Sequence, residues 1–370
     1  MDLQKFMSDN LRGLVQTAYL SVLSNPREAR FAMRLQSILA RDERRRKEML
    51  KDEGLEVPPF LIASIATACN LQCKGCYARK VGIASDEPTK EMLTADAWKH
   101  LFEEAASMGF NVALLAGGEP LTRRDVLESV ASVKDMLFPV FTNGTMIGAV
   151  YTDFFKKNLN MLPIISLEGD AGTTDTRRGK GVYERALKGM EMLHNEKLFF
   201  GVSITVTTEN KAAVTDPSYL DSLRALGCKI VFYVEYVPID EGTEHLAFRD
   251  EDVAWMERTL EERRVAYRDM IFVSFPGDEK LLDGCMAAGR GFFHIGPDGA
   301  AEPCPFSPHS DTNASRDGLR AALRSPLFTK LRSASAMAWE HTGGCTLFEH
   351  RDEVEAMTAR SGLRRGTWRQ

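Results

Sequence analysis

The sequence predicts an α/β fold: a partial (β/α)6 TIM-like barrel with a helical N-terminal extension and a small α+β C-terminal domain. Between residues 60 and 270, apolar strand-like runs alternate with amphipathic helical stretches, and beyond 270 the elements become short. Six such units are too few to close an eight-stranded barrel, so we expect an open side that admits a bulky substrate. The expected domains are 1–58, 59–270 and 271–370.

The N-terminal segment is expected to be helical. Apolar residues recur with helical periodicity over 11–23, and Asn25 with Pro26 forms a start signal for a second helix. This helix carries a charge-rich run over 41–51 and stops at the two prolines that follow Val57. We interpret the run as a solvated helix face, and peripheral contact with an anionic membrane is the alternative.

The barrel segment and the C-terminal segment each predict a defined series of elements. The barrel strands are expected at 61–66, 112–115, 138–142, 163–167, 202–206 and 230–237, and the intervening helices include 94–108, 124–137, 182–194, 219–226 and 251–268. The C-terminal segment predicts a β-hairpin, formed by 292–295 and 300–303 around a Gly-Pro-Asp-Gly turn, and short helices near 318–323 and 351–359.

The composition is that of an ordinary folded protein. Of 370 residues, 44% are hydrophobic and 27% are charged, which argues against disorder or collagen-like repeats. The net charge of -5 lacks the basic excess of a dedicated nucleic-acid binder. No apolar stretch approaches the roughly 20 residues of a membrane span, and the N-terminus lacks the pattern of a secretory signal. We therefore expect a cytoplasmic protein without a nucleic-acid partner.

Three cysteines, Cys69, Cys73 and Cys76, follow the first predicted strand on one short loop. A reducing compartment disfavours disulfides, so their spacing points first to a metal or a cluster. Thiolates are the preferred ligands of iron–sulfur centres. A four-iron cubane held by three cysteines leaves one iron open to an external amino and carboxylate pair. The alternative is a structural zinc site, which would need a fourth ligand from elsewhere.

The loop Cys69-Asn-Leu-Gln-Cys73-Lys-Gly-Cys76-Tyr77 resembles the signature of the radical S-adenosylmethionine (radical SAM) superfamily, over roughly residues 61–237. The resemblance implies an oxygen-sensitive enzyme that cleaves S-adenosylmethionine reductively at a [4Fe-4S] cluster. The resulting 5′-deoxyadenosyl radical abstracts hydrogen from a substrate, and an external flavodoxin or ferredoxin type donor supplies the electron. The aromatic residue that often precedes the third cysteine is Gly75 here, and the packing of adenine is assigned to Tyr77.

Motifs at the ends of later strands extend this resemblance. Two glycines after the second strand let the backbone approach a ligand closely, and the motif that they begin resembles the one that holds the methionyl amino group. A serine and an arginine after the fourth strand are implied to contact the ribose and the carboxylate, and a bidentate guanidinium suits a carboxylate. A plain surface arginine is the alternative for the latter. The implied cofactor residues are Gly117, Gly118, Glu119, Pro120, Asn143, Ser166 and Arg178, with Tyr77.

Glu235 is the candidate catalytic residue of the sixth strand, where it shares a face with Tyr233. A carboxylate in an apolar strand is costly unless it has a partner. We expect Glu235 to point into the barrel cavity and to bind substrate or move a proton. A structural ion pair is the alternative.

The C-terminal cysteines Cys285, Cys304 and Cys345 lie around sequence that resembles the SPASM/twitch extensions of radical SAM enzymes. The resemblance implies an auxiliary iron–sulfur cluster of the [4Fe-4S] type. Its fourth ligand is left open among His309, His341, His350, a carboxylate, the substrate and none. Cys228 is expected to be a buried hydrophobic residue.

The substrate is expected to be a peptide or protein, by analogy with enzymes that carry such extensions. A small metabolite, or a lipid presented by the N-terminal helices, stays open, and a non-catalytic metal or cluster module is the rival function. The sequence names neither the substrate nor the reaction outcome. It leaves the oligomeric state open as well.

Overall fold

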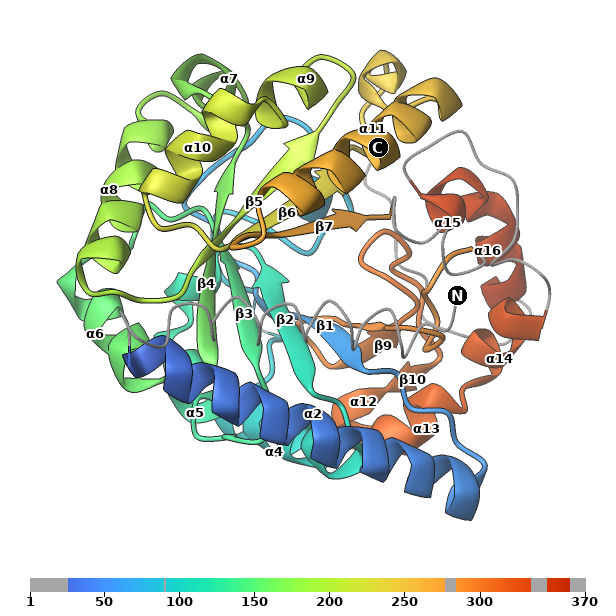
Figure 1. Ribbon diagram of the computed structural model, residues 1–370. Coiled ribbons are helices and arrows are strands. Elements are labelled where there is room, and N and C mark those ends of the chain that lie inside the picture. Colours follow the sequence, from blue (N-terminus) through green and yellow to red (C-terminus); the bar gives the residue numbers. More distant parts are fainter. Residues whose placement is uncertain (1–25, 90, 277–283, 334–344, 360–370) are drawn as a thin grey trace.

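A computed structural model describes residues 26–89, 91–276, 284–333 and 345–359, and its framework is one curved sheet (Figure 1). The strand order is β10-β9-β8-β1-β2-β3-β4-β5-β6-β7, with β7 and β10 at the edges of the described sheet. The run from β1 to β7 is parallel throughout. The partial α/β barrel expected from the sequence is therefore confirmed.

The elements have the following bounds. The strands are β1 (Phe60–Ala66), β2 (Val112–Gly117), β3 (Phe138–Thr142), β4 (Met161–Leu167), β5 (Gly201–Val206), β6 (Ile230–Glu235), β7 (Ile271–Phe275), β8 (His294–Ile295), β9 (Ala300–Glu302) and β10 (Thr312–Asn313). The barrel helices are α3 (Tyr77–Lys80), α4 (Ala95–Met108), α5 (Arg124–Val130), α6 (Ala149–Lys157), α7 (Ala171–Arg178), α8 (Val182–Asn195), α9 (Lys211–Val214), α10 (Pro217–Ala225) and α11 (Asp250–Ala266). The flanking helices are α2 (Pro26–Glu53), α12 (Ala314–Asp317), α13 (Leu319–Leu323), α14 (Pro326–Ser333), α15 (Thr346–Glu349) and α16 (Arg351–Ala359).

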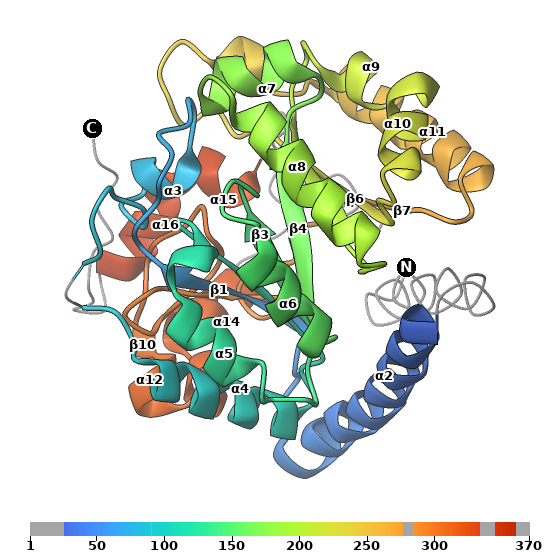
Figure 2. The ribbon, with the colours of Figure 1, turned by 90° about the vertical axis from the view of Figure 1, so that its left-hand side faces the viewer.

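The helices between successive strands cover the outer side of the curved sheet (Figures 1 and 2). Aromatic side chains fill the layer between α4 and the sheet: Trp98 stacks on Phe102 with ring centroids 5.6 Å apart. Phe102 in turn meets Phe138 of β3 edge-on at 5.2 Å. Every residue of β1 is buried, as expected for a parallel strand covered on both faces.

The sequence prediction stopped the barrel one strand early. Strand β7 lies beyond residue 270 and pairs in parallel with β6, with Ile230 opposite Ile271. Its run of five residues is short, and the change of pattern after residue 270 concealed it. The predicted C-terminal hairpin is confirmed as the antiparallel pair β8 and β9, but it also joins the free edge of β1, where Ile62 lies opposite His294.

A buried hydrogen-bonded chain fastens this hairpin to the barrel. The hydroxyl of Ser64 lies 2.8 Å from Nε2 of His294, and Nδ1 of His294 lies 2.6 Å from the carboxylate of Glu302. His294 is 0% exposed, and a chain with both ring nitrogens bonded satisfies its buried polar atoms. Since Ser64 is on β1, the C-terminal hairpin is held directly against the strand that leads into the cysteine loop.

Helix α2 confirms the expected second N-terminal helix, and the first expected helix, at 11–23, lies outside the described residues. In Figure 2 α2 stands on one side of the barrel. The expectation that its charge-rich run is a solvated face is only partly right. Arg44 and Lys47 are exposed, whereas Asp42 and Arg46 are buried. Arg46 donates to the carbonyl of Gly109 at 2.6 Å, so these charges dock α2 on α4.

Asp42 is expected to make the stability of the protein depend on pH. Burial raises the pKa of its carboxyl to about 6, although Arg41 and Arg45 oppose the shift. A carboxyl whose pKa is raised on folding binds protons more tightly in the folded state, so its contribution to stability falls as pH rises through the folded pKa. Relative to wild type, Asp42→Asn should gain at most about 3 kcal/mol in unfolding free energy between pH 4 and 7.

Urea unfolding at several pH values measures this difference. Asp52→Asn, at an exposed position of the same helix, is the matched control and should follow the wild-type curve. Parallel pH profiles for Asp42→Asn and wild type would contradict the assignment of a raised pKa to Asp42.

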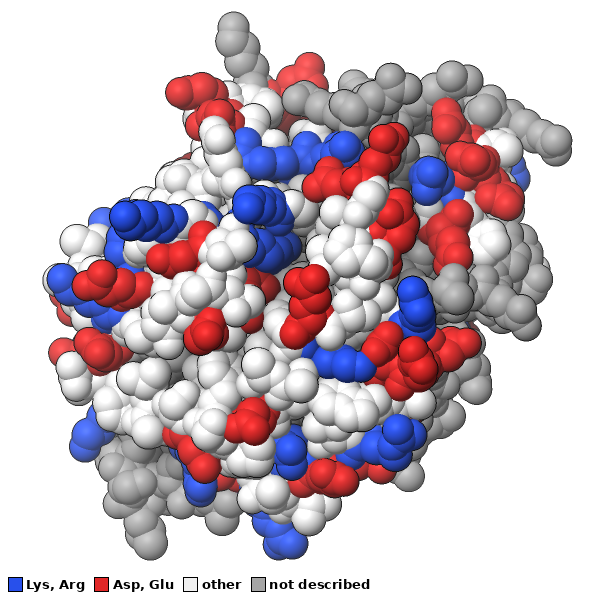
Figure 3. Space-filling view, turned by 90° about the horizontal axis from the view of Figure 1, so that it is seen from above, with Lys and Arg blue, Asp and Glu red and all other residues white. Residues whose placement is uncertain are grey.

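Two surface properties bear on partners. Within the described part of the chain, no helix is both long and apolar enough to cross a membrane. On the face shown in Figure 3, acidic and basic side chains are interspersed.

Candidate active site

The cysteine loop connects β1 to α3 and is tied to three other parts of the fold. The amide of Cys69 donates to the carbonyl of Ser85 at 3.0 Å, and the amide of Lys74 donates to the carbonyl of Arg177 at 2.8 Å. The side-chain amide of Asn143, just past β3, donates to Asn70 at 2.8 Å. The backbone that carries the three thiols is therefore held in place by the barrel itself.

The thiols of the loop are half-buried and free. Burial raises the pKa of Cys69 to about 11, and the neighbouring carboxylate of Glu119 and thiols of Cys73 and Cys76 raise it further. A cation or cluster would displace these protons, because thiolates are the metal-binding form. The loop thus places three soft donors close to one another.

Two arginines at the end of α7 face the same loop. Burial raises the pKa of Cys73, while the guanidinium groups of Arg178 and Arg177 oppose this shift. Arg178 donates through Nε to the buried carboxylate of Glu168 at 2.7 Å, and Arg177 pairs with the same oxygen. The side chain of Arg178 is only 11% exposed, so it is not a surface arginine. Arg177 was missed by the sequence analysis, although the Arg-Arg pair was a visible signal.

The paired glycines are required by the approach of β2 to the start of the cysteine loop. Gly117 has φ +119°, and a Cβ on it would lie 2.3 Å from the carbonyl oxygen of Ala66. A Cβ on Gly118 would lie 2.3 Å from the carbonyl oxygen of Ala68. The amide of Gly118 donates to Ala66 at 2.7 Å, which a side chain at either position would disturb.

Glu119 joins the ends of two strands. It is 1% exposed, and its carboxylate accepts hydrogen bonds from the hydroxyl of Thr142 at 2.7 Å and the amide of Asn143 at 2.8 Å. A third bond comes from the amide of Leu121, at 3.0 Å, in the turn that Pro120 begins. Burial nevertheless raises the pKa of Glu119. The structure shows a positioning role for this residue, and its contact with a cofactor stays a prediction.

A cavity of about 360 Å³ lies inside the barrel beside the loop. It brings together residues from the cysteine loop, β2, β4, α7 and β6. Its lining includes Cys73, Gly75, Cys76, Tyr77, Gly117, Gly118, Ser166, Arg177, Arg178, Glu235 and Tyr236. Cys69, Glu119, Pro120 and Asn143 are outside this lining. Most of the cofactor residues expected from the sequence therefore border one cavity.

The fold and this site agree with what the comparisons with known proteins found. A family model described as "Radical SAM superfamily" matches residues 63–216. This match covers less than half of the chain, and it assigns a radical SAM domain to that segment. The matched segment holds the three-cysteine loop, the paired glycines and both arginines of α7, and the radical SAM relatives below support an enzyme.

Several radical SAM relatives cover most of the chain. An AdoMet-dependent heme synthase of Methanosarcina barkeri is 29% identical over 82% of this chain and 92% of its own length. A PqqA peptide cyclase of Granulibacter bethesdensis is 23% identical over 68% of each chain. The crystal structure of Streptococcus suis SuiB bound to S-adenosylmethionine has the same fold, with a TM-score of 0.64, 17% identity, and coverage of 80% of this chain and 72% of that chain.

The departure from the common radical SAM pattern at Gly75 has a structural reason. Gly75 has φ +63°, and a Cβ there would lie 2.9 Å from the ring of Tyr236. Tyr236 of the β6 end therefore occupies the space that a side chain at position 75 would take. Tyr77 packs on Phe306 instead, with ring centroids 4.9 Å apart, and its buried hydroxyl lies near both Cys76 and Cys304, which contribute to raising its pKa.

Glu235 ends β6 and is buried at the border of the cavity. Its alternation partner Tyr233 does not face the cavity: the Tyr233 hydroxyl donates to the carbonyl of Val214 at 2.8 Å, at the end of α9. Phe232 and Val234, on the opposite face, line the cavity. The strand face that Glu235 shares with Tyr233 therefore points away from the cavity. Glu235 borders the cavity because it lies at the end of the strand.

The three C-terminal cysteines meet although they are far apart in sequence. The thiols of Cys304 and Cys345 are hydrogen-bonded, and Cys285 lies close enough to raise the pKa of Cys304. Burial raises the pKa of Cys304, and the bond from Cys304 lowers the pKa of Cys345. Cys228 is buried elsewhere, as expected, and donates to the carbonyl of Ile230 at 3.2 Å. Among the described residues, neither cysteine group is gathered into a set of three side chains in coordinating geometry.

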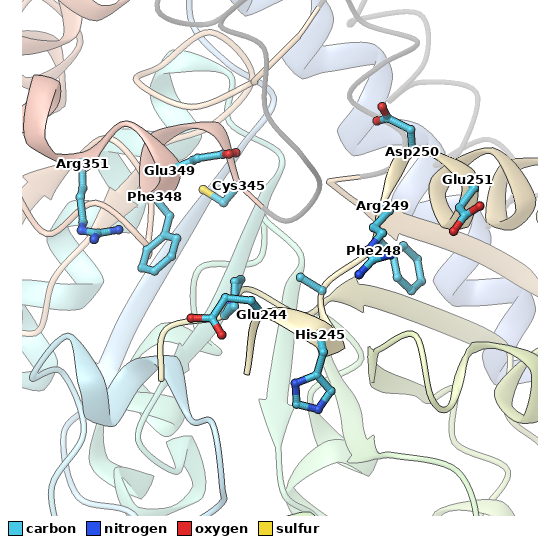
Figure 4. A pocket seen from close by; sticks show the side chains of 12 residues that line it. Glu244, His245, Phe248, Arg249, Asp250, Glu251, Cys345, Phe348, Glu349 and Arg351 are labelled. Atoms are coloured by element: carbon cyan, nitrogen blue, oxygen red, sulfur yellow. The ribbon is translucent and has the colours of Figure 1, made fainter. Parts of the chain in front are cut away.

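Cys345 opens onto a second, larger pocket of about 930 Å³ (Figure 4). Glu349 and Phe348 of α15, together with Arg351 of α16, form one wall of this pocket. The opposite wall comes from the segment between β6 and α11 and from the start of α11. It presents the charged side chains of Glu244, Arg249, Asp250 and Glu251 and the imidazole of His245. The pocket therefore offers charges of both signs beside Cys345.

Proposed function

We propose that this radical SAM enzyme binds a [4Fe-4S] cluster through Cys69, Cys73 and Cys76 and holds S-adenosylmethionine in the 360 Å³ cavity. The observation that carries the proposal is the meeting of the Cys73 and Cys76 thiols with Arg178, Ser166 and the paired glycines around one cavity. When bound, the reduced cluster and S-adenosylmethionine supply methionine and a 5′-deoxyadenosyl radical, which takes a hydrogen atom from the substrate.

The residues of the cavity suit the parts of this cofactor. The guanidinium of Arg178 suits the methionyl carboxylate, which it can bind bidentately. Glu168 pairs with both arginines and offsets one of their two positive charges. Its Oε2 atom is buried without a partner among the described residues, which leaves one acceptor for a donor group of a ligand. Gly117 and Gly118 keep the β2 end free of side chains, and Glu119 with Asn143 fixes the loop above it.

Two further assignments complete the proposed site. Tyr77 packs against the adenine from the cysteine-loop side, since its ring borders the cavity. Glu235 binds substrate or moves a proton at the cavity border, where it is buried at the end of an apolar strand. An external donor of the flavodoxin or ferredoxin type supplies the electron.

Anaerobic reconstitution tests the proposed function. The chain is loaded with iron and sulfide, and 5′-deoxyadenosine is measured after addition of S-adenosylmethionine and dithionite. We expect a brown protein that forms 5′-deoxyadenosine only under reduction. A colourless protein that binds zinc through the loop and forms none would show the structural metal site instead.

We further propose that residues 271–370 form a SPASM/twitch-like part with an auxiliary [4Fe-4S] cluster on Cys285, Cys304 and Cys345. The hydrogen bond between two of these thiols and the proximity of the third support it. Tyr77, which packs on Phe306, lies near both Cys76 and Cys304. In this proposal the auxiliary cluster binds substrate or accepts an electron from a substrate radical.

Cys304→Ala is expected to separate cofactor cleavage from product formation. Loss of one auxiliary ligand should leave the catalytic loop intact, so cleavage without substrate stays within about threefold of wild type, while product formation falls at least about tenfold. Liquid chromatography of 5′-deoxyadenosine and product measures both. Cys228→Ala, a buried thiol in neither group, is the control. Full product turnover by Cys304→Ala would remove the role of the second cluster.

For the substrate we propose a peptide or protein. The likeness to a PqqA peptide cyclase supports it, and so does the mixed charge of the 930 Å³ pocket beside Cys345, which suits the charged side chains of a peptide. A small molecule of the haem type is the second candidate, because the M. barkeri heme synthase is matched over 92% of its length. Deuterium transfer from labelled candidates into 5′-deoxyadenosine distinguishes the two classes.

A further inference from the structure

His309 is a buried imidazole whose ring makes no hydrogen bond. It is 1% exposed, and neither Nδ1 nor Nε2 has a hydrogen-bond partner among the residues that the structure describes. Buried polar groups are nearly always paired, and each exception calls for an explanation such as an ion or a water. A buried ring with two unpaired nitrogens is therefore available to bind an ion or a water.

The backbone ties His309 to the segment that carries Cys304. The amide of Ser307 donates to the carbonyl of Cys304 at 3.0 Å, and the amide of His309 donates to the carbonyl of Ser307 at 2.8 Å. These bonds fold the segment from Cys304 to His309 into one tight turn. The hydroxyl of Ser307 is likewise buried without a partner in the described chain, so one turn carries a thiol and two unpaired polar groups.

The other histidines considered as ligands differ from His309. His350 is half-buried at the end of α15, and its Nδ1 lies 3.6 Å from the carboxylate of Glu353. His341 lies outside the described residues. Among the described candidates, His309 alone combines full burial with two unpaired ring nitrogens and a place on the turn of Cys304.

We propose that His309 supplies the fourth ligand of the auxiliary cluster, beside Cys285, Cys304 and Cys345. The inference rests on the auxiliary cluster proposed above and goes beyond it by naming the ligand. Binding through one ring nitrogen would pair one of the two unsatisfied atoms. A neutral imidazole in place of a thiolate also makes the cluster less negative, and such replacement raises the reduction potential of iron–sulfur centres.

Pulsed electron paramagnetic resonance tests the ligand directly. The experiment uses the full chain with Cys69, Cys73 and Cys76 all changed to Ala, so that only the auxiliary cluster is reconstituted. We expect a directly bonded nitrogen coupling in the reduced cluster, which changes to the ¹⁵N pattern when histidine is labelled. In this background His309→Cys should keep the iron, lose the nitrogen coupling and lower the midpoint potential, while His350→Gln should leave all three unchanged.

The outcomes are separable. A cluster without nitrogen coupling, or a coupling that persists in His309→Cys, would overturn the assignment while the auxiliary cluster stands. Failure of the triple variant to retain iron, with circular dichroism showing a folded chain, would remove the auxiliary cluster and the role of His309 together. Cleavage of S-adenosylmethionine by the wild-type chain tests the catalytic cluster independently of all these results.

Discussion

Replacing Cys73 with alanine is expected to abolish reductive cleavage of S-adenosylmethionine. Cys73 borders the cavity and lies beside Arg178 and Arg177, so its thiolate stands where cluster and cofactor would meet. The loop offers three thiols, and the loss of one leaves too few ligands for a cubane. We expect 5′-deoxyadenosine formation to fall at least about 100-fold, since even outer partners of metal ligands cost 10–100-fold when mutated.

The comparison is made on anaerobically reconstituted protein, with iron content and 5′-deoxyadenosine measured together. The catalytic share of the iron should disappear in Cys73→Ala, while the share held by the auxiliary group stays. Cys228→Ala removes a thiol that is buried away from both groups and should keep full cleavage. Cleavage by Cys73→Ala at the wild-type rate would mean that the loop does not hold the catalytic cluster.

The cysteine loop and the barrel could be predicted because both are local patterns. Strand and helix periodicity is written in adjacent residues, and Cys69, Cys73 and Cys76 are neighbours in sequence. The same holds for Gly117 and Gly118, whose need for close backbone approach was anticipated from residue type alone. What each approaches, the carbonyl oxygens of Ala66 and Ala68, needed the structure.

Long-range relations escaped the sequence for a physical reason: nothing local encodes which distant segments meet. Tyr236, just past the end of β6, fills the space beside Gly75. The sequence alone shows only that the aromatic residue common before the third cysteine is absent here. The hydrogen bond between the thiols of Cys304 and Cys345 and the pairing of the C-terminal hairpin with β1 are also contacts between segments that are distant in sequence. The pairing of Arg177 with Glu168 is likewise a contact that no local pattern encodes.

Gly118→Ala is expected to destabilise the protein strongly. The added Cβ would lie 2.3 Å from the carbonyl oxygen of Ala68 and 2.7 Å from that of Thr67. Both obstacles are backbone atoms, so no side-chain rotation relieves the overlap, and the β2 end or the cysteine loop must move. We expect a loss of at least about 3 kcal/mol in unfolding free energy, which is the range of severe backbone and packing defects. Urea unfolding measures it.

Gly148→Ala is the matched control, because a Cβ on Gly148 would meet nothing within 4 Å. Its unfolding free energy should stay within about 1 kcal/mol of wild type. Gly118→Ala should also disturb the cysteine loop. Gly118 and Glu119 both donate backbone hydrogen bonds to the Ala66 to Ala68 segment, so a shift of the β2 end also moves Cys69. A variant that unfolds like wild type and still retains the catalytic iron would show that the loop is not fixed by the end of β2.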